Sequence, residues 1–600
     1  MDIRSLPDML EVRASHSPDK PALRSKKSGK WRALSWKEFH ERAREISFGL
    51  LALGMNAGDR VCILAKTREE WMIADFGITG AGGVTVPIYP SNLAEQCAYI
   101  INDSGARFIF ADDSQQLKKL QSVRNKTPEL EKAILFDGVG VNDWAISLND
   151  LIQGGRGAAA EFEEEYRKRR TAQEKETPAT IIYTSGTTGE PRGAVLPNRA
   201  FTIGCPNALK SLPLGHEDEM ILFLPLAHSF AKMLAVSCVF MGITISFAES
   251  VERAIGNIKE INPTFFGSVP RVFEKIHQKI INQSENLSPV QKRAFKWAFQ
   301  IGYARSRLLE ARKPVPPHIE LAYKAAEKVV FQKARKFFGS RLKFCISGGA
   351  PLSVEVARFF HAAGIIILEG YGMTENNSIS TVNRIDHYKF GSIGRPHVGI
   401  EIKLAEDGEI LQRGATNMLG YYNDEQTTRE TIDAEGWLYS GDIGEIDDDG
   451  FLKITDRKKD IIITAGGKNI APQNIESLMK SSGYISQCMI YGDNRKYLVA
   501  LLTLDEEAIT RFARERGIKY SEYAELAQHP DIISLIDEEI AERNKKLASY
   551  ETIKKFKILP RELSEAEGEI TPSLKVKKKK ILNKYKNLLD ELYPTDDLGF

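Results

Sequence analysis

The segment 183–193, which reads YTSGTTGEPRG, is rich in glycine and hydroxyl residues and lies between two apolar runs at 181–182 and 194–196. This arrangement predicts a loop between two strands. Glycines let backbone N–H groups approach an anion closely, and hydroxyl groups add further donors. Arg192 adds a positive charge near the end of the segment. The loop therefore favours binding of a phosphate chain.

Two other interpretations of this loop fit the sequence less well. A Walker A site would need a Gly-Lys-Ser/Thr step at fixed spacing, and the chain has none. A flexible linker has a similar composition, but linkers seldom connect two apolar strands. Phosphate binding remains the better interpretation.

The chain has 600 residues, which is too long for one hydrophobic core and predicts two or more domains. Its composition, 42% hydrophobic and 27% charged, is that of an ordinary soluble protein. The formal net charge of +2 gives no indication of a nucleic-acid partner.

The cysteines are scattered without a CxxC pair, which predicts reduced thiols in a cytoplasmic compartment and no zinc site. Asp2 and Arg4 precede any apolar run, so no signal peptide is expected. The apolar stretch 234–248 is too short to span a membrane and predicts a buried helix and strand. Peripheral contact with the inner face of the membrane stays open. The cysteines are Cys62, Cys97, Cys205, Cys238, Cys345 and Cys488.

Strand and helix patterns alternate through the first half. Ser35 is a polar N-cap before an apolar stripe that runs to Leu51, and strands are expected at 61–65 and 84–87. Such alternation predicts an α/β fold with mostly parallel sheets. The acidic run 161–165 is typical of a solvated helix face.

Two glycine-rich turns follow strand patterns in the second half, at 347–351 (SGGAP) and 369–375 (EGYGMTE). Ligands gather at the carboxyl ends of strands in open α/β sheets, so both turns are candidates for a binding site. Further on, Asp449-Gly450 predicts a hairpin turn. A smaller α+β domain is expected after about residue 457.

These motifs together resemble the AMP-forming acyl- and aryl-CoA synthetases, an adenylating superfamily, over residues 10 to 590. The segment 265–276 (FFGSVPRVFEKI) and the basic helical region 277–338 resemble the long-chain fatty acid–CoA ligase branch. The resemblance implies a large adenylation domain at 1–456, with mostly parallel sheets, helices and a β-barrel-like subdomain. It also implies a small, mobile α+β domain at 457–600.

The resemblance implies that most of the candidate site residues bind ATP or Mg²⁺. Glu375 and Thr184 would hold Mg²⁺ and act in catalysis, and the carboxylate of Asp442 would accept hydrogen bonds from the ribose hydroxyls, supported by Arg457. Arg192 stands where most relatives have lysine, and Asn376 stands where they have a small hydroxyl residue. The expected ATP- and AMP-binding residues are Thr184, Ser185, Gly186, Thr187, Thr188, Gly189, Arg192, Gly348, Gly349, Ala350, Tyr371, Gly372, Met373, Thr374, Asp442 and Arg457.

By the same resemblance Lys575 is the catalytic lysine, which would bridge the attacking carboxylate and the α-phosphate.

His228, in LPLAHSF, would border the acyl pocket, although a lone histidine in an apolar segment is more often a core residue. Asp456 and Lys459 would form the hinge between the domains. Gly466, Gly467 and Lys468 would meet coenzyme A. The run 577–580 is all lysine, and could be a solvated face or contact CoA phosphates or an anionic membrane.

The expected function is ATP-dependent activation of a long-chain fatty acid to acyl-CoA through an acyl-adenylate, with release of AMP and pyrophosphate. The alternatives are an acyl-AMP ligase that passes its product to a carrier protein, and a non-catalytic sensor with the same fold. Expected partners are fatty acid, ATP, Mg²⁺ and CoA, without nucleic acid. The oligomeric state stays open, a dimer included.

Overall fold

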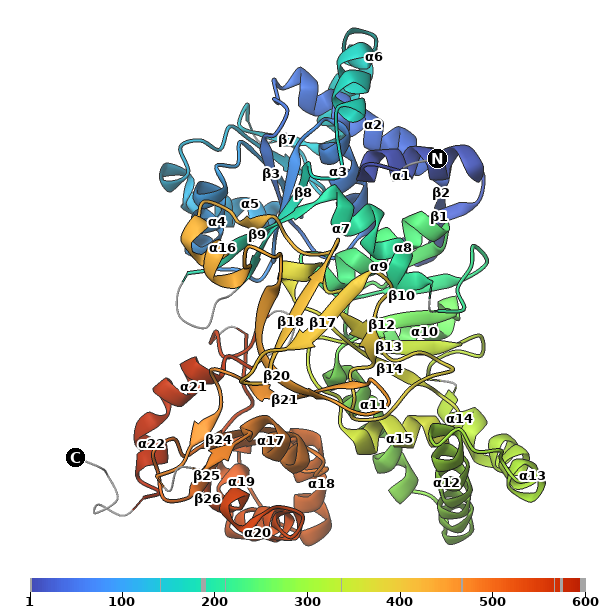
Figure 1. The fold of residues 1–600 in the computed structure, drawn as a ribbon, viewed down its shortest axis with the longest axis vertical. Helices are drawn as coiled ribbons and strands as arrows, with labels where there is room; N and C mark the ends of the chain where they lie inside the picture. The colour runs from blue at the N-terminus through green and yellow to red at the C-terminus, as the bar shows by residue number, and fades with distance from the viewer. Residues whose placement is uncertain are drawn as a thin grey trace.

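The computed structural model describes residues 3–140, 142–184, 190–210, 212–335, 337–465, 468–565, 567–571 and 576–593. The described strands form two large sheets, a four-stranded sheet and two small sheets near the C-terminus (Figure 1). Helices cover the faces of the large sheets, so the predicted α/β class is confirmed.

A nine-stranded sheet has the order β16-β15-β14-β13-β12-β10-β11-β1-β2. Its central strands, from β14 to β1 in that order, pair in parallel. The helix α9 (Ser229–Met241) precedes β11, so the apolar stretch 234–248 is a buried helix and strand, as predicted. The strands are β1 (Pro21–Lys27), β2 (Lys30–Ser35), β10 (Glu219–Leu222), β11 (Thr244–Phe247), β12 (Phe265–Ser268), β13 (Phe344–Ser347), β14 (Ile367–Tyr371), β15 (Thr381–Val382) and β16 (Arg395–Pro396).

An eight-stranded sheet has the order β19-β9-β8-β4-β3-β5-β6-β7. The two strands predicted around the phosphate loop are β8 and β9, which pair antiparallel with Thr184 opposite Arg192. Both ends of that loop are thereby fixed on one hairpin. The strands are β3 (Arg60–Leu64), β4 (Val84–Ile88), β5 (Phe108–Ala111), β6 (Lys132–Leu135), β7 (Ala145–Ser147), β8 (Pro178–Thr184), β9 (Arg192–Pro197) and β19 (Gly420–Tyr421).

The predicted helix after Ser35 is α2 (Trp36–Ala52). The Ser35 hydroxyl accepts a hydrogen bond from the Glu38 N–H at 3.2 Å, and the Glu38 carboxylate accepts one from the Ser35 N–H at 2.7 Å. This reciprocal pair satisfies two backbone donors at the helix start. The helices α3 (Glu69–Gly80) and α6 (Leu148–Thr171) pack on α2, and the acidic run lies on α6 with Glu161, Glu163 and Glu164 exposed.

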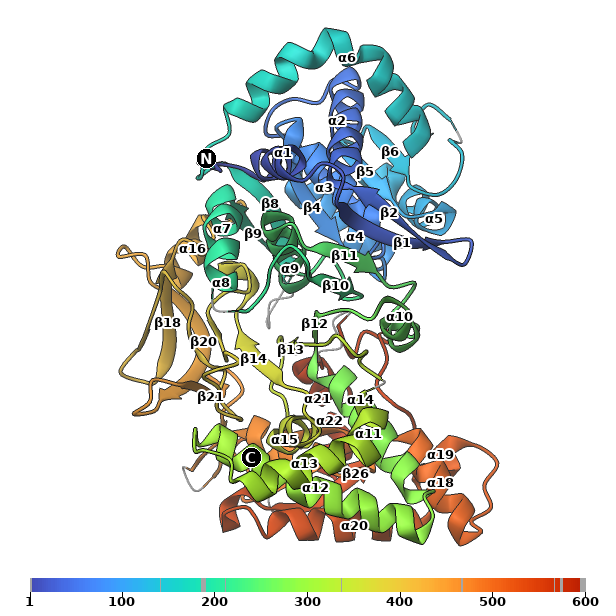
Figure 2. The ribbon, with the colours of Figure 1, turned by 90° about the vertical axis from the view of Figure 1, so that its right-hand side faces the viewer.

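An antiparallel sheet of β17 (Ile400–Leu404), β18 (Glu409–Gly414), β20 (Leu438–Ile446) and β21 (Leu452–Arg457) corresponds to the barrel-like subdomain expected from the sequence (Figure 2). The Asp449-Gly450 turn joins β20 to β21, and Gly450 has a φ of 78°, a left-handed conformation that glycine adopts without steric cost. The predicted hairpin is confirmed.

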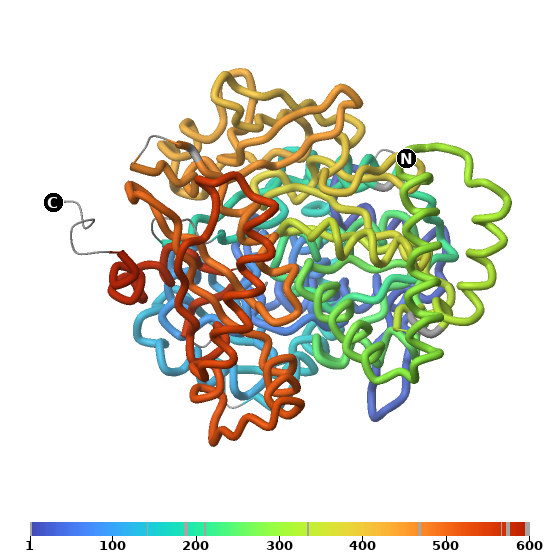
Figure 3. The backbone as a smooth tube through the Cα atoms, turned by 90° about the horizontal axis from the view of Figure 1, so that it is seen from below, coloured from blue at the N-terminus to red at the C-terminus, as the bar shows by residue number. Residues whose placement is uncertain are grey.

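The chain after β21 packs around two hydrophobic clusters that contain only residues from Ile462 onward. Figure 3 shows these orange and red elements beside the green helices of the middle of the chain. The elements are β22 (Ile462–Ile463), β23 (Asn469–Ile470), α17 (Pro472–Lys480), β24 (Ile485–Tyr491), β25 (Leu498–Leu504), α18 (Glu506–Arg516), α19 (Tyr523–Ala527), α20 (Pro530–Asn544), β26 (Ile553–Ile558), α21 (Lys578–Lys584) and α22 (Lys586–Asp590).

The basic region predicted to be helical forms α11 (Pro270–Glu285), α12 (Pro289–Glu310) and α13 (Pro317–Ala326), followed by a π-helical turn (Glu327–Phe331) and α14 (Gln332–Arg335). The prolines between 314 and 317 separate α12 from α13, because proline cannot continue a helix. The helix α12 packs on α15 (Val354–Ala362) beside the nine-stranded sheet.

All six cysteines are buried and free of disulfide bonds, in agreement with the prediction of reduced thiols. Within the described ranges, no helix has both the length and the apolar character needed to cross a membrane.

Candidate active site

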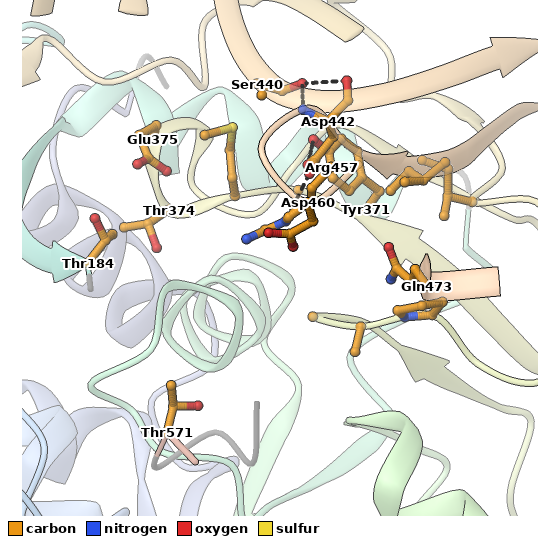
Figure 4. Close-up of a pocket in the computed structure, with 18 of the residues that line it drawn as sticks. Thr184, Tyr371, Thr374, Glu375, Ser440, Asp442, Arg457, Asp460, Gln473 and Thr571 are labelled. Carbon is orange, nitrogen blue, oxygen red and sulfur yellow. Dashed lines mark hydrogen bonds and ion pairs between the residues drawn. The ribbon is translucent and has the colours of Figure 1, made fainter. Parts of the chain in front are cut away.

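A cavity of about 1100 Å³ lies where the two large sheets, the four-stranded sheet and the C-terminal elements meet (Figure 4). Thr184 from the end of β8, Tyr371 from the end of β14, Asp442 from β20 and Gln473 from α17 all line it. The carboxyl ends of β13 and β14 face this cavity, which is where ligands bind in open α/β sheets. The cavity therefore gathers residues from the whole length of the chain.

Asp442 and Arg457 form the charged centre of one wall. They stand opposite each other on β20 and β21, and the Arg457 Nε donates to Asp442 Oδ1 at 3.1 Å. The Tyr371 hydroxyl donates to Asp442 Oδ2 at 2.5 Å. The Asp442 side chain is 7% exposed and that of Arg457 is 56% exposed, so the guanidinium reaches into the open cavity. Burial, followed by the charge of Asp442, raises the pKa of Tyr371 well above its ordinary value.

Glu375 follows β14 in a short helical turn and lines the same cavity. The Tyr421 hydroxyl donates to Glu375 Oε1 at 2.7 Å, and burial raises the pKa of Glu375. The neighbouring Thr374 hydroxyl lies 3.4 Å from the hydroxyl of Ser229. A buried carboxylate beside hydroxyl groups at a cavity wall offers the oxygen donors that Mg²⁺ prefers.

The two ends of the predicted phosphate loop, Thr184 and Arg192, both line the cavity. The Arg192 Nε pairs with Asp424 Oδ2 at 3.0 Å, and its side chain is 46% exposed. Among the residues between these ends, Ser185, Gly186, Thr187, Thr188 and Gly189 lie outside the described residues.

His228 lines this cavity and also a second, mostly apolar cavity of about 50 Å³. Phe230, Met233 and Leu234 from α9 also line the small cavity, together with His397. Gly348, expected on the nucleotide side, lines only the small cavity, whereas Gly349 lines both.

The predicted hinge residues are close to the large cavity. Lys459 lines it, whereas Asp456 is 2% exposed and is not among the lining residues. Asp456 Oδ1 accepts a hydrogen bond from the Arg457 N–H at 2.6 Å, and Oδ2 has no partner among the described residues. Burial raises the pKa of Asp456 to about 6.

Among the residues predicted for the CoA side and for the catalytic lysine, none of the described ones lines the nucleotide cavity. Lys468 is exposed, 6.0 Å from the centre of the Tyr550 ring, and does not line the nucleotide cavity. Gly466, Gly467 and Lys575 lie outside the described residues. The described residues on either side of Lys575 include Thr571 and Lys577, and both line the cavity.

Two site residues were given no individual role from the sequence, although one of them, Glu369, lies in the candidate turn 369–375. Tyr421 lies far along the chain from its partner Glu375, and no local pattern points to it. Glu369 could have been found, because it is an acid within the apolar strand β14 directly before Gly370. It is 6% exposed and lines the cavity.

The carboxylate of Glu369 ties two loops of the site together. Its Oε1 accepts a hydrogen bond from the Leu352 N–H at 3.0 Å, and the carboxylate also accepts one from the Gly391 N–H. Burial raises the pKa of Glu369 from its ordinary value of 4.5 to about 7. The group is therefore partly protonated at neutral pH.

We expect Glu369→Gln to stabilise the protein at pH 8 relative to the parent, but far less at pH 5. The pKa of Glu369 is about 4.5 in the unfolded chain and about 7 in the folded protein, so the folded state holds the proton more tightly. This contribution to the free energy of unfolding is complete below pH 4.5 and is lost as the pH rises through about 7. The full loss is about 3 kcal/mol, and an uncharged glutamine does not suffer it. Thermal unfolding of both proteins across this pH range would measure the difference, with exposed Glu406→Gln as the control. A difference that is the same at every pH would contradict the assignment.

Comparisons with known proteins agree with this geometry. The profile of the AMP-binding enzyme family matches residues 10–422, and that of the AMP-binding enzyme C-terminal domain matches residues 459–597. The long-chain-fatty-acid–CoA ligase FadD15 of Mycobacterium bovis is 35% identical over 571 residues, covering 94% of this chain and 93% of that protein.

Two solved structures share the fold. The anthranilate CoA ligase AuaEII, in complex with anthranoyl-AMP, has a TM-score of 0.74 at 21% identity and covers 98% of each chain. The o-succinylbenzoate CoA synthetase of Bacillus subtilis, in complex with ATP and a magnesium ion, has a TM-score of 0.66 at 21% identity, covering 95% of this chain and 98% of that one. The family profiles and the relative at 35% identity, together with the cavity, show that the chain belongs to the AMP-binding enzyme family, as an AMP-forming acyl-CoA synthetase.

Proposed function

We propose that this protein converts a long-chain fatty acid, ATP and CoA into acyl-CoA, AMP and pyrophosphate. One observation carries the proposal: a single cavity contains both ends of the phosphate loop, the buried Glu375 and the Asp442–Arg457 pair. The name of the FadD15 relative supports the long-chain acid as substrate.

ATP would lie along the cavity between these groups. The carboxylate of Asp442 would accept hydrogen bonds from the ribose hydroxyls, and Arg457 would support the same sugar. Tyr371, Gly372, Met373 and Thr374 would line the adenine and α-phosphate side with Gly349 and Ala350. The glycine- and hydroxyl-rich loop 184–189, with Arg192, would surround the outer phosphates.

The donor set at Glu375 fits Mg²⁺. The carboxylate lines the cavity, accepts only the Tyr421 hydroxyl among its side-chain partners in the described structure, and has Thr184 on the same cavity wall. Glu375 and Thr184 would hold the ion. When bound, Mg²⁺ would offset negative charge on the phosphates.

The reaction would proceed in two steps. The fatty acid carboxylate attacks the α-phosphorus of ATP, the bond to pyrophosphate breaks, and acyl-adenylate forms. The CoA thiol then loses its proton and attacks the acyl carbonyl carbon, and AMP leaves. Lys575 would stabilise the charge that develops in the first step by contacting the carboxylate and the α-phosphate. Its chain neighbours Thr571 and Lys577 line the cavity, which supports this role.

We also propose a division of the chain into a large domain at 1–456 and a small domain at 457–600 that rotates between the two steps. The separate hydrophobic clusters after Ile462 support this boundary, and Asp456 and Lys459 would form the hinge. Rotation would bring Gly466, Gly467 and Lys468 toward the CoA arm. The exposed position of Lys468, away from the nucleotide cavity, is compatible with a role in the second step only.

The acyl chain would enter beside His228, which lines both cavities. The small cavity of about 50 Å³ holds only a few water-sized groups. A long acyl chain therefore needs the side chains of α9 that line it to move. Met233 is suited to this, because an unbranched thioether changes rotamer easily.

A product assay tests the proposal. Purified protein with ATP, Mg²⁺, palmitate and CoA should form AMP, pyrophosphate and palmitoyl-CoA, with turnover that depends on CoA. Pyrophosphate with acyl-adenylate left bound and no thioester would favour the alternative, an acyl-AMP ligase that serves a carrier protein. Failure to form any product from any acid would favour a sensor.

A further inference from the structure

The helices α12 to α14 carry a strong excess of positive charge. Residues 289–335 contain eleven lysine and arginine residues and three glutamates, an excess of eight, although the whole chain has a formal net charge of only +2. We call these residues the basic arm. Its α12–α13 hairpin projects at the lower right of Figure 1, on the side opposite α21 and α22.

The glutamates of the basic arm do not neutralise its outer surface. Glu310 pairs with Arg358 at 3.3 Å, Glu320 with Arg305 at 2.9 Å, and Glu327 with Arg335 at 2.6 Å. Each of the three glutamates therefore forms an ion pair with an arginine and leaves the other described cations of the arm without a carboxylate. In the described part of the chain, eight exposed cations of the arm have no ion pair with a carboxylate: Lys292, Arg293, Lys296, Arg307, Arg312, Lys313, Lys324 and Lys328.

Exposed apolar side chains lie among these cations. Val290 is 75% exposed and Trp297 is 39% exposed, and the two are seven residues apart on one face of α12. On α13, Leu321 is 72% exposed and shares a face with Lys324. Exposed apolar side chains among cations that have no carboxylate partner suit a partner that is both apolar and anionic.

The opposite face of α12 is firmly packed. Phe299 stacks on Phe359 of α15 with ring centres 4.4 Å apart, and Gly302 lies so close to the Ala362 carbonyl that a Cβ there would come within 2.5 Å of its oxygen. Ala298 is fully buried. The backbone of α12 is therefore already held on the large domain before a partner binds.

We propose that the basic arm docks this enzyme on an anionic lipid bilayer. Lysine and arginine gain from the negative surface potential of such a bilayer, while tryptophan, leucine and valine insert at the boundary between headgroups and acyl chains. A nucleic acid or an acidic protein would match the charge but would leave Val290 and Leu321 unexplained. The choice of a bilayer also rests on the proposed function, since a long-chain fatty acid partitions into membranes.

Sedimentation of the full-length protein with phosphatidylcholine vesicles, with and without phosphatidylglycerol, tests the proposal. We expect binding only to the anionic vesicles. Lys292→Glu combined with Arg293→Glu and Lys296→Glu should weaken binding about 100-fold, and Val290→Ser with Leu321→Ser about tenfold. The matched controls are Lys30→Glu with Arg32→Glu and Lys37→Glu, and Val139→Ser; these residues are exposed and lie outside the arm, and their substitution should leave binding unchanged.

Three results would overturn the proposal: no binding of the parent protein to anionic vesicles, equal loss in the control and arm variants, or binding that the serine variant does not weaken. The last result would indicate a purely electrostatic surface for an acidic protein or nucleic acid. The arm variants should keep parental acyl-CoA synthesis from dissolved fatty acid without vesicles. Since vesicle binding is measured without substrates, a protein that binds vesicles but makes no thioester would contradict the proposed function and leave the docking surface standing.

Discussion

Replacement of Lys575 by alanine should lower the rate of acyl-adenylate formation by two to three orders of magnitude, on the scale of removing one preorganised donor from a transition state. The physical reason is charge. The attacking carboxylate and the α-phosphate are both anionic, and a lysine ammonium between them offsets the repulsion as the new P–O bond forms. Pyrophosphate release from ATP and palmitate, without CoA, measures this step directly.

The second step offers an internal control for this variant. If Lys575 acts only on the first step, the Lys575→Ala protein should still convert supplied palmitoyl-adenylate and CoA into palmitoyl-CoA at nearly the parental rate. Lys579→Ala is a matched control, because Lys579 is an exposed lysine of the run 577–580 that closely follows Lys575 in the sequence, on α21. Equal losses in both lysine variants, or a loss in both steps, would remove Lys575 from the proposed role and indicate a general effect of charge.

The sequence was most informative where local chemistry sets the backbone. The Ser35 N-cap, the Asp449-Gly450 turn and the apolar runs around the phosphate loop each depend on neighbouring residues, and the structure contains all three. Asp442 and Arg457 were also within reach, because a hairpin between them places them opposite each other on adjacent strands.

Contacts between distant segments could not be predicted in the same way. Tyr421 reaches Glu375 only because β19 joins the edge of the eight-stranded sheet beside β9, a pairing that no local pattern encodes. Glu369 was visible as an acid in a strand, but its raised pKa depends on burial beneath loops from Leu352 and Gly391. The size of the acyl cavity likewise depends on how side chains of α9 pack, which is a three-dimensional property.

Replacement of Asp442 by alanine should weaken ATP binding by on the order of 100-fold or more. A buried carboxylate that accepts hydrogen bonds from both ribose hydroxyls contributes about 1.5–3 kcal/mol for each, and alanine removes both acceptors. The two oxygens of Asp442 accept hydrogen bonds from Tyr371 and Arg457, and these contacts hold the carboxylate in one orientation toward the cavity. Preorganisation of this kind lowers the cost of binding.

Equilibrium binding of ATP to the parent protein, Asp442→Ala and Asp442→Asn would measure this contribution. Asparagine keeps the shape and one acceptor oxygen but loses the charge, so its ATP affinity should lie between the other two. Asp448→Ala, an exposed acid in the turn that joins the same two strands, should bind ATP like the parent. Because Asp442→Ala also deprives the buried Tyr371 hydroxyl of its acceptor, the thermal unfolding of each variant must be compared with the parent. A folded Asp442→Ala protein with unchanged ATP affinity would exclude Asp442 from ribose recognition, and the Asp442–Arg457 pair would then be a structural link between β20 and β21.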